Sequence, residues 1–328
     1  MTTMTHDAAA VRTSGLGFAV LSASSFSLSG PLARGLMDAG WSAAAAVAAR
    51  ILLAALVLTP LAVVQLRGRW HVLRGNLALI TAYGLVAVAG CQLAFFNAVA
   101  RLPVGIALLI EYTAPVAVIG WLWLRRGQRP SRRTVLGALL GALGLVLVLD
   151  AVSGAHADLV GILWAFAAMV GGATYFVLSG RDDDGLPPVV LAAGGLLLGS
   201  VALLLAGATG IVTMTMTTAP VRFVGTTVAW WVPVSALGVV TAALAYVAGI
   251  AAARRLGSRL ASFVALTEVL AALVFAWVLL GEVPRAIQLV GGALVLAGVV
   301  VVKLGEPAAV AGTRLGAPSD LDMPGQSL

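Results

Sequence analysis

Long apolar runs separated by short polar turns fill most of this chain. An α-helix needs about 20 predominantly apolar residues to cross the hydrocarbon core of a bilayer. Ten runs approach or exceed that length, and they cover residues 15–34, 43–64, 76–99, 104–124, 134–150, 159–179, 187–208, 229–252, 259–280 and 286–304. The pattern therefore predicts an all-α integral membrane protein with ten transmembrane helices.

The composition agrees with this class. Hydrophobic residues make up 61% and charged residues 10% of the chain, which excludes a water-soluble globular protein. The net charge of +7 does not indicate nucleic acid, because the basic residues lie in short turns without interleaved aromatic residues. A single cysteine, Cys91, rules out an intramolecular disulfide and a cysteine-based metal cluster. We expect no cofactor and no metal; the expected partners are the lipid bilayer and a small-molecule substrate.

The chain contains an internal repeat. Residues 97–149 align without a gap onto residues 251–303 at a constant offset of 154, and 14 of the 53 aligned pairs are identical. Identities of this kind in an apolar chain indicate a duplicated half. The most specific pairs are Arg101 with Arg255, Thr113 with Thr267, Trp123 with Trp277 and Pro130 with Pro284.

The charges that flank the two copies are reversed. The turn after the aligned tryptophan is strongly basic in the first copy, whereas the turn before it is the more basic one in the second copy. Cytoplasmic loops collect Lys and Arg, so the copies are expected to lie in the membrane in opposite orientations. Inverted repeats place a site near the bilayer midplane, as in secondary transporters. The basic turns hold Arg125, Arg126, Arg129, Arg132 and Arg133 in the first copy, and Arg254, Arg255 and Arg259 in the second.

The positions of all 20 Lys and Arg residues test this orientation. With the N-terminus inside, 15 of them fall in cytoplasmic segments and 4 in outer segments, while Arg50 lies within a span. Both termini of this multi-pass cell-membrane protein are therefore expected in the cytoplasm. The predicted organisation is a cytoplasmic segment (1–14), a first five-helix repeat (15–150), a second, inverted repeat (151–304) and a disordered cytoplasmic tail (305–328).

Glycines occur within the spans as well as in the turns. The fifth span carries Gly137 and Gly141 four residues apart, and the tenth carries the pair Gly291 and Gly292. Small residues let helix backbones approach closely in lipid. These glycines fit packing within the chain, and those of the fifth span also fit a homodimer.

Three ionisable side chains fall well inside predicted spans: Arg50, Glu111 and Glu268. An unpaired charge at that depth costs several kcal/mol, so such residues usually face a cavity or a partner. In one interpretation, a buried carboxyl group binds a substrate amine or a coupling proton. In the other, Arg50 and Glu111 form an ion pair that only locks two helices together. No such partner is evident for Glu268.

Uncharged polar side chains extend the same candidate surface. Any one of them is explained equally well by a hydrogen bond to a neighbouring helix. Together they favour the third, fourth, eighth and ninth spans as the walls of a substrate- or proton-binding cavity. They are Gln92, Asn97, Tyr112, Thr113, Tyr175, Tyr246 and Thr267.

Several stretches carry a family resemblance. Ala49–Leu53, Phe96–Leu102 and Trp277–Glu282 resemble the EamA-type transporters of the drug/metabolite transporter superfamily. Leu102–Ala107 followed by Ile110–Pro115 is similar to the threonine/homoserine exporter branch. The resemblance covers residues 15–304 and implies a ten-helix inner-membrane exporter of amino acids or related small metabolites.

Two other classes of function compete with a transporter. A membrane-embedded lipid-modifying enzyme needs a catalytic or metal constellation, but His6, His71 and His156 are scattered, and the acidic run Asp182–Asp184 is typical of a solvated loop. A channel or a non-transporting scaffold is the third class. The inverted repeat favours a transporter, because alternating access is what that symmetry most naturally serves.

The predicted topology can be tested by accessibility labelling. We expect the turn at residues 125–133 and the turn at residues 254–259 to be labelled from the cytoplasmic side, because both are rich in arginine. Labelling of the two turns from opposite faces of the membrane would contradict the inverted arrangement.

Overall fold

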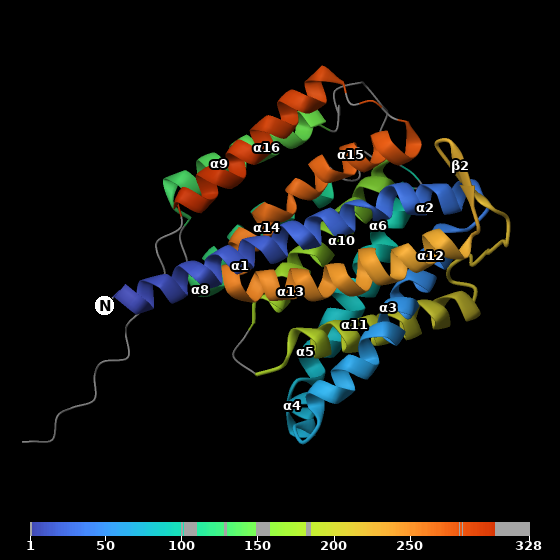
Figure 1. Ribbon diagram of the computed structural model, residues 1–328, viewed down its shortest axis with the longest axis horizontal. Coiled ribbons are helices and arrows are strands. Elements are labelled where there is room, and N and C mark those ends of the chain that lie inside the picture. The colour runs from blue at the N-terminus through green and yellow to red at the C-terminus, as the bar shows by residue number, and fades with distance from the viewer. Residues whose placement is uncertain are drawn as a thin grey trace, which may run out of the picture.

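The computed structural model describes residues 2–99, 101, 110–127, 130–148, 158–181, 185–281, 283 and 285–305. Within these ranges the chain is almost entirely helical, and Figure 1 shows most of the long helices running side by side. The predicted tail at 305–328 lies almost wholly outside the described residues, as does the start of the predicted fourth span.

Seven helices in the described ranges are long and apolar enough to cross a membrane. The chain is thus a multi-pass, mainly helical membrane protein. The seven are Thr13–Asp38, Ala43–Leu66, Leu77–Phe95, Leu159–Ser179, Pro188–Ala208, Trp231–Leu256 and Ser258–Leu280, and a shorter apolar helix covers Leu289–Val302.

Breaks and π-helical segments divide several of these spans. The elements of the first part of the chain are α1 (Thr2–Ser27), α2 (Ser29–Asp38), α3 (Ala43–Leu66), α4 (Trp70–Gly75), α5 (Leu77–Ala82), the π-helical segment η1 (Tyr83–Gly90), α6 (Cys91–Val99), α8 (Ala114–Arg126) and α9 (Arg132–Val148). Those of the second part are α10 (Leu159–Ser179), α11 (Pro188–Ala208), β1 (Val221–Phe223), β2 (Thr226–Val228), α12 (Trp231–Gly238), the π-helical segment η2 (Val239–Leu244), α13 (Ala245–Leu256), α14 (Ser258–Ala265), α15 (Thr267–Leu280) and α16 (Ala286–Gly305).

The first helix is longer than the sequence pattern predicts. The pattern predicts a separate segment before residue 15, whereas α1 begins at Thr2 and continues into the first span. Three successive alanines at residues 8–10 explain the extension, since alanine has the highest helix propensity.

The two parts of the chain share local geometry at positions 154 residues apart. The segments η1 and η2 end at Gly90 and Leu244. Gly127 and Gly281 follow α8 and α15 with left-handed φ angles of +64° and +74°, which end both helices where a residue with a β-carbon would be strained. The duplication seen in the sequence therefore extends to helix interruptions and helix ends.

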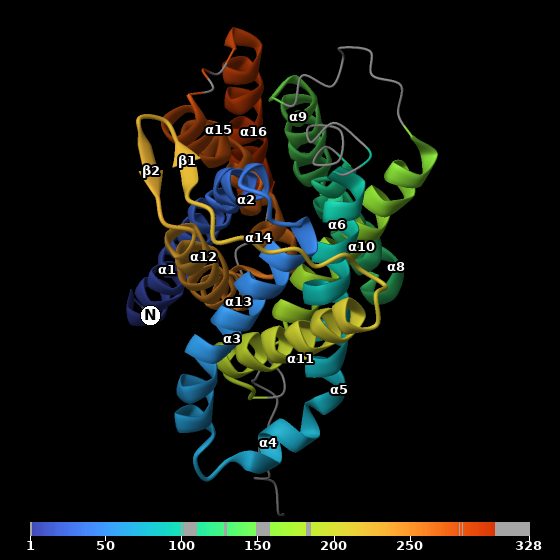
Figure 2. The ribbon, with the colours of Figure 1, turned by 90° about the vertical axis from the view of Figure 1, so that its right-hand side faces the viewer.

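A short hairpin covers one end of the helices. Strands β1 and β2 pair antiparallel, with Val221 opposite Val228, and Figure 2 looks onto this end of the molecule. The segment that leads into the hairpin is tied to the α2–α3 turn, where the Trp41 Nε1 donates to the Thr217 carbonyl at 2.9 Å and the Ser42 amide donates to the Thr215 carbonyl at 2.9 Å. The all-α expectation does not include this hairpin, which lies outside the spans.

Helices α9 and α16 lie side by side in both Figure 1 and Figure 2. A β-carbon added to Gly144 would lie 2.6 Å from the carbonyl oxygen of Gly291, and one added to Gly137 would lie 2.7 Å from that of Gly298. Contacts this short require backbone against backbone, as small residues allow in lipid. The contacting residue number rises along α9 from 137 to 144 while it falls along α16 from 298 to 291, so the two helices run antiparallel.

Replacing Gly144 with alanine tests this contact. We expect Gly144→Ala to lower the free energy of unfolding by about 1–3 kcal/mol, because the added methyl group forces the two backbones apart. The matched control is Gly120→Ala in α8, where an added β-carbon meets no atom within 4 Å, so the higher helix propensity of alanine should leave stability unchanged or slightly raised. Equal unfolding curves for the two variants in detergent or nanodiscs would contradict the contact.

Candidate functional site

Two interrupted helices supply the candidate site. A turn at Tyr112 and Thr113 precedes α8, and a turn at Leu266 separates α14 from α15. The Thr113 hydroxyl donates to the Ile110 carbonyl at 2.6 Å, and the Thr267 hydroxyl donates to the Val264 carbonyl at 2.7 Å. Both threonines thus donate a side-chain hydrogen bond to a carbonyl at the interruption, and at Ile110 this bond adds to the one from the Thr113 amide. The sequence predicts them as cavity-lining residues, and the structure gives them this local role.

Glu268 lies in the first turn of α15 and is partly buried. The N-terminus of a helix carries a partial positive charge, which favours a carboxylate there. The Tyr112 side chain lies beside the Glu268 side chain. A tyrosine at the interruption of one helix therefore lies next to the acidic residue at the interruption of the other.

Glu111 lies beside the single cysteine. The Cys91 Sγ is 3.8 Å from Glu111 Oε1 and 3.5 Å from the carbonyl oxygen of Ala168. Gly171 on α10 makes room for this thiol, since an added β-carbon would lie 2.5 Å from that of Cys91. The cysteine thus links α6 and α10 to the carboxyl group of Glu111, a contact that no spacing in the sequence indicates.

The structure brings the three ionisable residues of the spans together. Glu111 and Arg50 both lie within electrostatic interaction range of Glu268. Two ionised carboxylates and one guanidinium would leave one uncompensated negative charge. In a low dielectric such an imbalance strongly favours a bound cation, either a proton or an ammonium group.

Arg50 does not form the ion pair with Glu111 that the sequence allows. Its Nη2 donates to the backbone carbonyl of Thr241 at 2.6 Å, its Nη1 lies 3.5 Å from Gln92 Oε1, and its guanidinium stacks 5.6 Å from the centre of the Phe26 ring. The salt bridges within the described ranges join Arg34 to Asp38 and Arg101 to Asp158. The alternative of a purely structural Arg50–Glu111 lock is therefore wrong in this conformation.

The π-helical segments place the next pair of polar residues. Gln92 and Tyr246 each lie two residues after such a segment, and the Gln92 Nε2 donates to the Tyr246 hydroxyl at 3.4 Å. Insertions of this kind in α-helices are often found at functional sites. Thr241, whose carbonyl binds Arg50, belongs to η2 itself. The two segments thus set the positions of a polar chain that runs from Arg50 through Gln92 to Tyr246.

A cluster of tyrosines packs beside this chain. The Tyr246 ring is centred 5.7 Å from that of Tyr175 and 6.5 Å from that of Tyr83, and the Tyr175 and Tyr83 rings are 5.9 Å apart. The Tyr175 hydroxyl is next to Ser22. Sequence reasoning identifies Tyr175 and Tyr246 but misses Tyr83, whose hydroxyl inside an apolar run was a usable signal.

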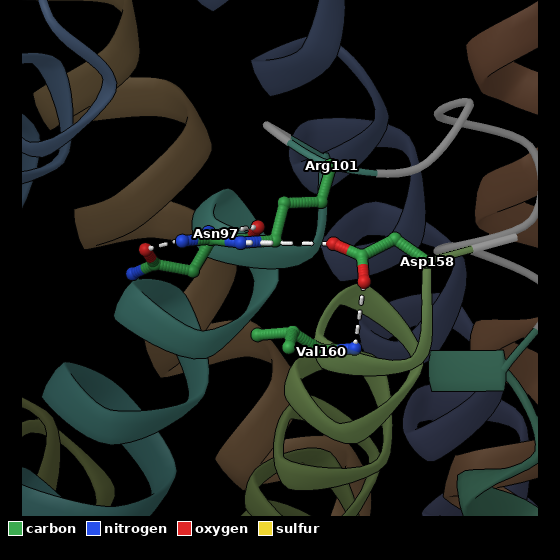
Figure 3. Close-up of polar contacts among 4 residues, drawn as sticks. All are labelled: Asn97, Arg101, Asp158 and Val160. Atoms are coloured by element: carbon green, nitrogen blue, oxygen red, sulfur yellow. Dashed lines mark hydrogen bonds and ion pairs between the residues drawn. The ribbon is translucent and has the colours of Figure 1, made fainter.

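Asn97 takes part in a separate contact. Its Nδ2 donates to the Leu93 carbonyl at 2.8 Å, and Arg101 Nη1 donates to the Asn97 carbonyl at 3.2 Å. Figure 3 shows that Arg101 reaches from there to Asp158, with 4.0 Å between its Nε and the carboxylate, while Asp158 caps α10 by accepting from the Val160 amide at 3.0 Å. The structure therefore gives Asn97 a role in joining α6 to α10 rather than in the carboxylate cluster.

The described residues contain no group of three or more His, Cys, Asp or Glu side chains that could hold a metal ion. Asp182–Asp184, His156 and Glu282 lie outside the described ranges.

Comparison with known proteins places this arrangement in a family. A model described as the EamA-like transporter family matches residues 13–150 and again residues 159–304. An uncharacterized transporter of Archaeoglobus fulgidus is 31% identical over 208 residues, covering 63% of this chain and 70% of that protein. The uncharacterized transporter YvbV of Bacillus subtilis is 32% identical over 108 residues, covering 32% of this chain and 35% of that protein.

A solved crystal structure has the same fold. It superimposes with a TM-score of 0.71 at 21% sequence identity and covers 90% of this chain and 98% of its own. Since the family model matches both parts of the sequence, the chain belongs to the EamA-like transporter family.

Proposed function

We propose that this protein is a secondary transporter that exports amino acids or related small metabolites by alternating access around a cavity at the bilayer midplane. The observation that carries the proposal is the proximity of Tyr112 to Glu268, which brings together the interruptions of the two repeat-equivalent helices. Interrupted helices at a repeat interface are typical of substrate and coupling-ion sites in transporters. The similarity to the threonine/homoserine exporter branch supports amino acids as the substrate class.

The proposed architecture is ten helices in two inverted repeats, 15–150 and 151–304, with both termini in the cytoplasm. The contacts between α9 and α16 support it. Gly137 meets Gly298 while Gly144 meets Gly291, and each pair becomes the other when the repeats are exchanged. A contact that maps onto itself in this way is what a two-fold axis produces. The hydrogen bond between the equivalent residues Gln92 and Tyr246 fits the same axis.

The acidic pair is the proposed binding site for the charged amine of the substrate. Glu111 and Glu268 lie within electrostatic range of each other, so either an ammonium group or a proton relieves their repulsion. If the two cations exchange at this site, substrate movement is coupled to proton movement in the opposite direction. The two relatives are named as transporters, which supports transport over an enzymatic role.

Neutralising Glu268 tests the proposal. We expect Glu268→Gln to lower the initial rate of transport in proteoliposomes by roughly 10- to 100-fold, because a glutamine keeps the shape of the side chain but loses the charge-assisted contact with the amine. Asp38→Asn is the matched control, since this exposed carboxylate on α2 pairs only with Arg34 and its loss should leave transport unchanged. Folding of both variants is checked by gel filtration. Unchanged flux and unchanged pH dependence in Glu268→Gln would refute the assignment.

A further inference from the structure

Arg50 is unusual among the charged residues of this chain. It is only 5% exposed, and it is the one charged side chain among the buried residues of the described ranges. Removing a charge from water costs several kcal/mol unless the protein supplies compensating partners. The partners of Arg50 therefore indicate what the site is built to hold.

Those partners are neutral and leave part of the guanidinium unused. The two hydrogen bonds go to the Thr241 carbonyl and to the Gln92 amide oxygen, and the stacking partner is Phe26. The Nε is buried and has no hydrogen-bond partner among the described residues. A guanidinium has five N–H donors in a planar fork that matches a carboxylate. An anion is thus the missing complement on the side of the Nε.

A small pocket lies beside Arg50, between α2, α3 and α12. Small or apolar side chains form most of its wall, so the guanidinium and the Ser29 hydroxyl are its polar groups. In this conformation it admits a group of about the size of one water molecule. It is lined by Ser29 and Ala33 of α2, Ala46, Val47 and Arg50 of α3, and Leu237 of α12.

We propose that Arg50 binds the carboxylate of the transported substrate, so that the substrate class is a free amino acid and not an amine or an amino acid amide. The inference rests on the proposed transport function, which assigns a site for the substrate amine but none for its carboxylate. Arg50 lies within electrostatic range of Glu268, so the two residues present opposite charges to the two ends of a zwitterion. A bidentate arginine–carboxylate contact provides both affinity and orientation.

Binding at this position is linked to movement. Because the pocket admits so small a group, a carboxylate enters only when α2 and α12 separate from α3. The same arginine holds η2 through the Thr241 carbonyl, and Leu53 of α3 packs directly against Gly238 at the end of α12. A carboxylate bound to Arg50 therefore lies at the contact of α3, in the first part of the chain, with α12 and η2 in the second.

The experiment compares each proteinogenic L-amino acid with its α-amide by counterflow in proteoliposomes. The amide keeps the ammonium group and side chain but replaces the carboxylate by a neutral group. We expect the wild-type protein to prefer the transported acid over its amide by roughly 10- to 100-fold in KM, the size of a lost charge-assisted hydrogen bond. Arg50→Gln should abolish this preference by raising the KM for the acid, while the KM for the amide changes by less than about threefold.

Two further variants test the interpretation. Arg34→Gln, at the exposed arginine that directly follows Ala33 on α2, should keep the full preference for the acid. Arg50→Lys retains the charge without the planar fork and should keep part of it. If Arg50→Gln does not fold by gel filtration, the comparison of acid with amide in the wild type and in Arg50→Lys decides.

The outcomes separate the two proposals. Transport of amides or amines at the same KM as acids would overturn the role of Arg50 and leave the transport function standing. If a folded Arg50→Gln protein transports the acid and the amide equally poorly, Arg50 is a structural contact between helices, and this result would also overturn the inference. No flux of any acid, amide or amine in the wild type would overturn the proposed function itself.

Discussion

The bilayer interior offers no water to a polar group, and this constraint explains where the functional groups of the chain lie. Each helix interruption leaves backbone carbonyls that the protein itself must satisfy. Thr113 and Thr267 donate their hydroxyl groups to carbonyls at two interruptions, and Arg50 donates to the Thr241 carbonyl of η2. The polar side chains therefore supply hydrogen bonds at the helix interruptions, and both lie where the two parts of the chain meet.

The two parts of the chain solve the same packing problem in different ways. Helix α11 meets η1 through glycines, and a β-carbon on Gly84 would lie 2.8 Å from the Gly195 carbonyl. Helix α3 meets η2 instead through a buried guanidinium. Close backbone contact leaves no room for a ligand, whereas a long polar side chain holds the helices apart and offers donors between them. The duplicated fold thus keeps one contact tight and leaves polar donors between the helices at the other, which is where the proposed site lies.

The sequence reveals more about the charges than about their partners. Apolar length, the repeat and the depth of Glu111 and Glu268 all follow from residue type and spacing, and the structure places both carboxylates in one region with Arg50. The partner of Arg50 could not be predicted, because it is a backbone carbonyl that any residue carries. The π-helical segments could not be predicted either, because no residue type marks them. The same holds for the contact between Cys91 and Glu111, which no sequence spacing indicates.

Contributions from both parts make the site sensitive to their relative position. Arg50, Glu111 and Tyr112 come from the first part, and Thr241, Tyr246 and Glu268 come from the second. Electrostatic energy in a low dielectric changes steeply with separation, so in the proposed site a small rotation of one part against the other would alter the affinity for a charged substrate. A ligand shifts a conformational equilibrium only through such a difference in affinity. A site divided between two halves supplies that difference, which a site built within one half would not.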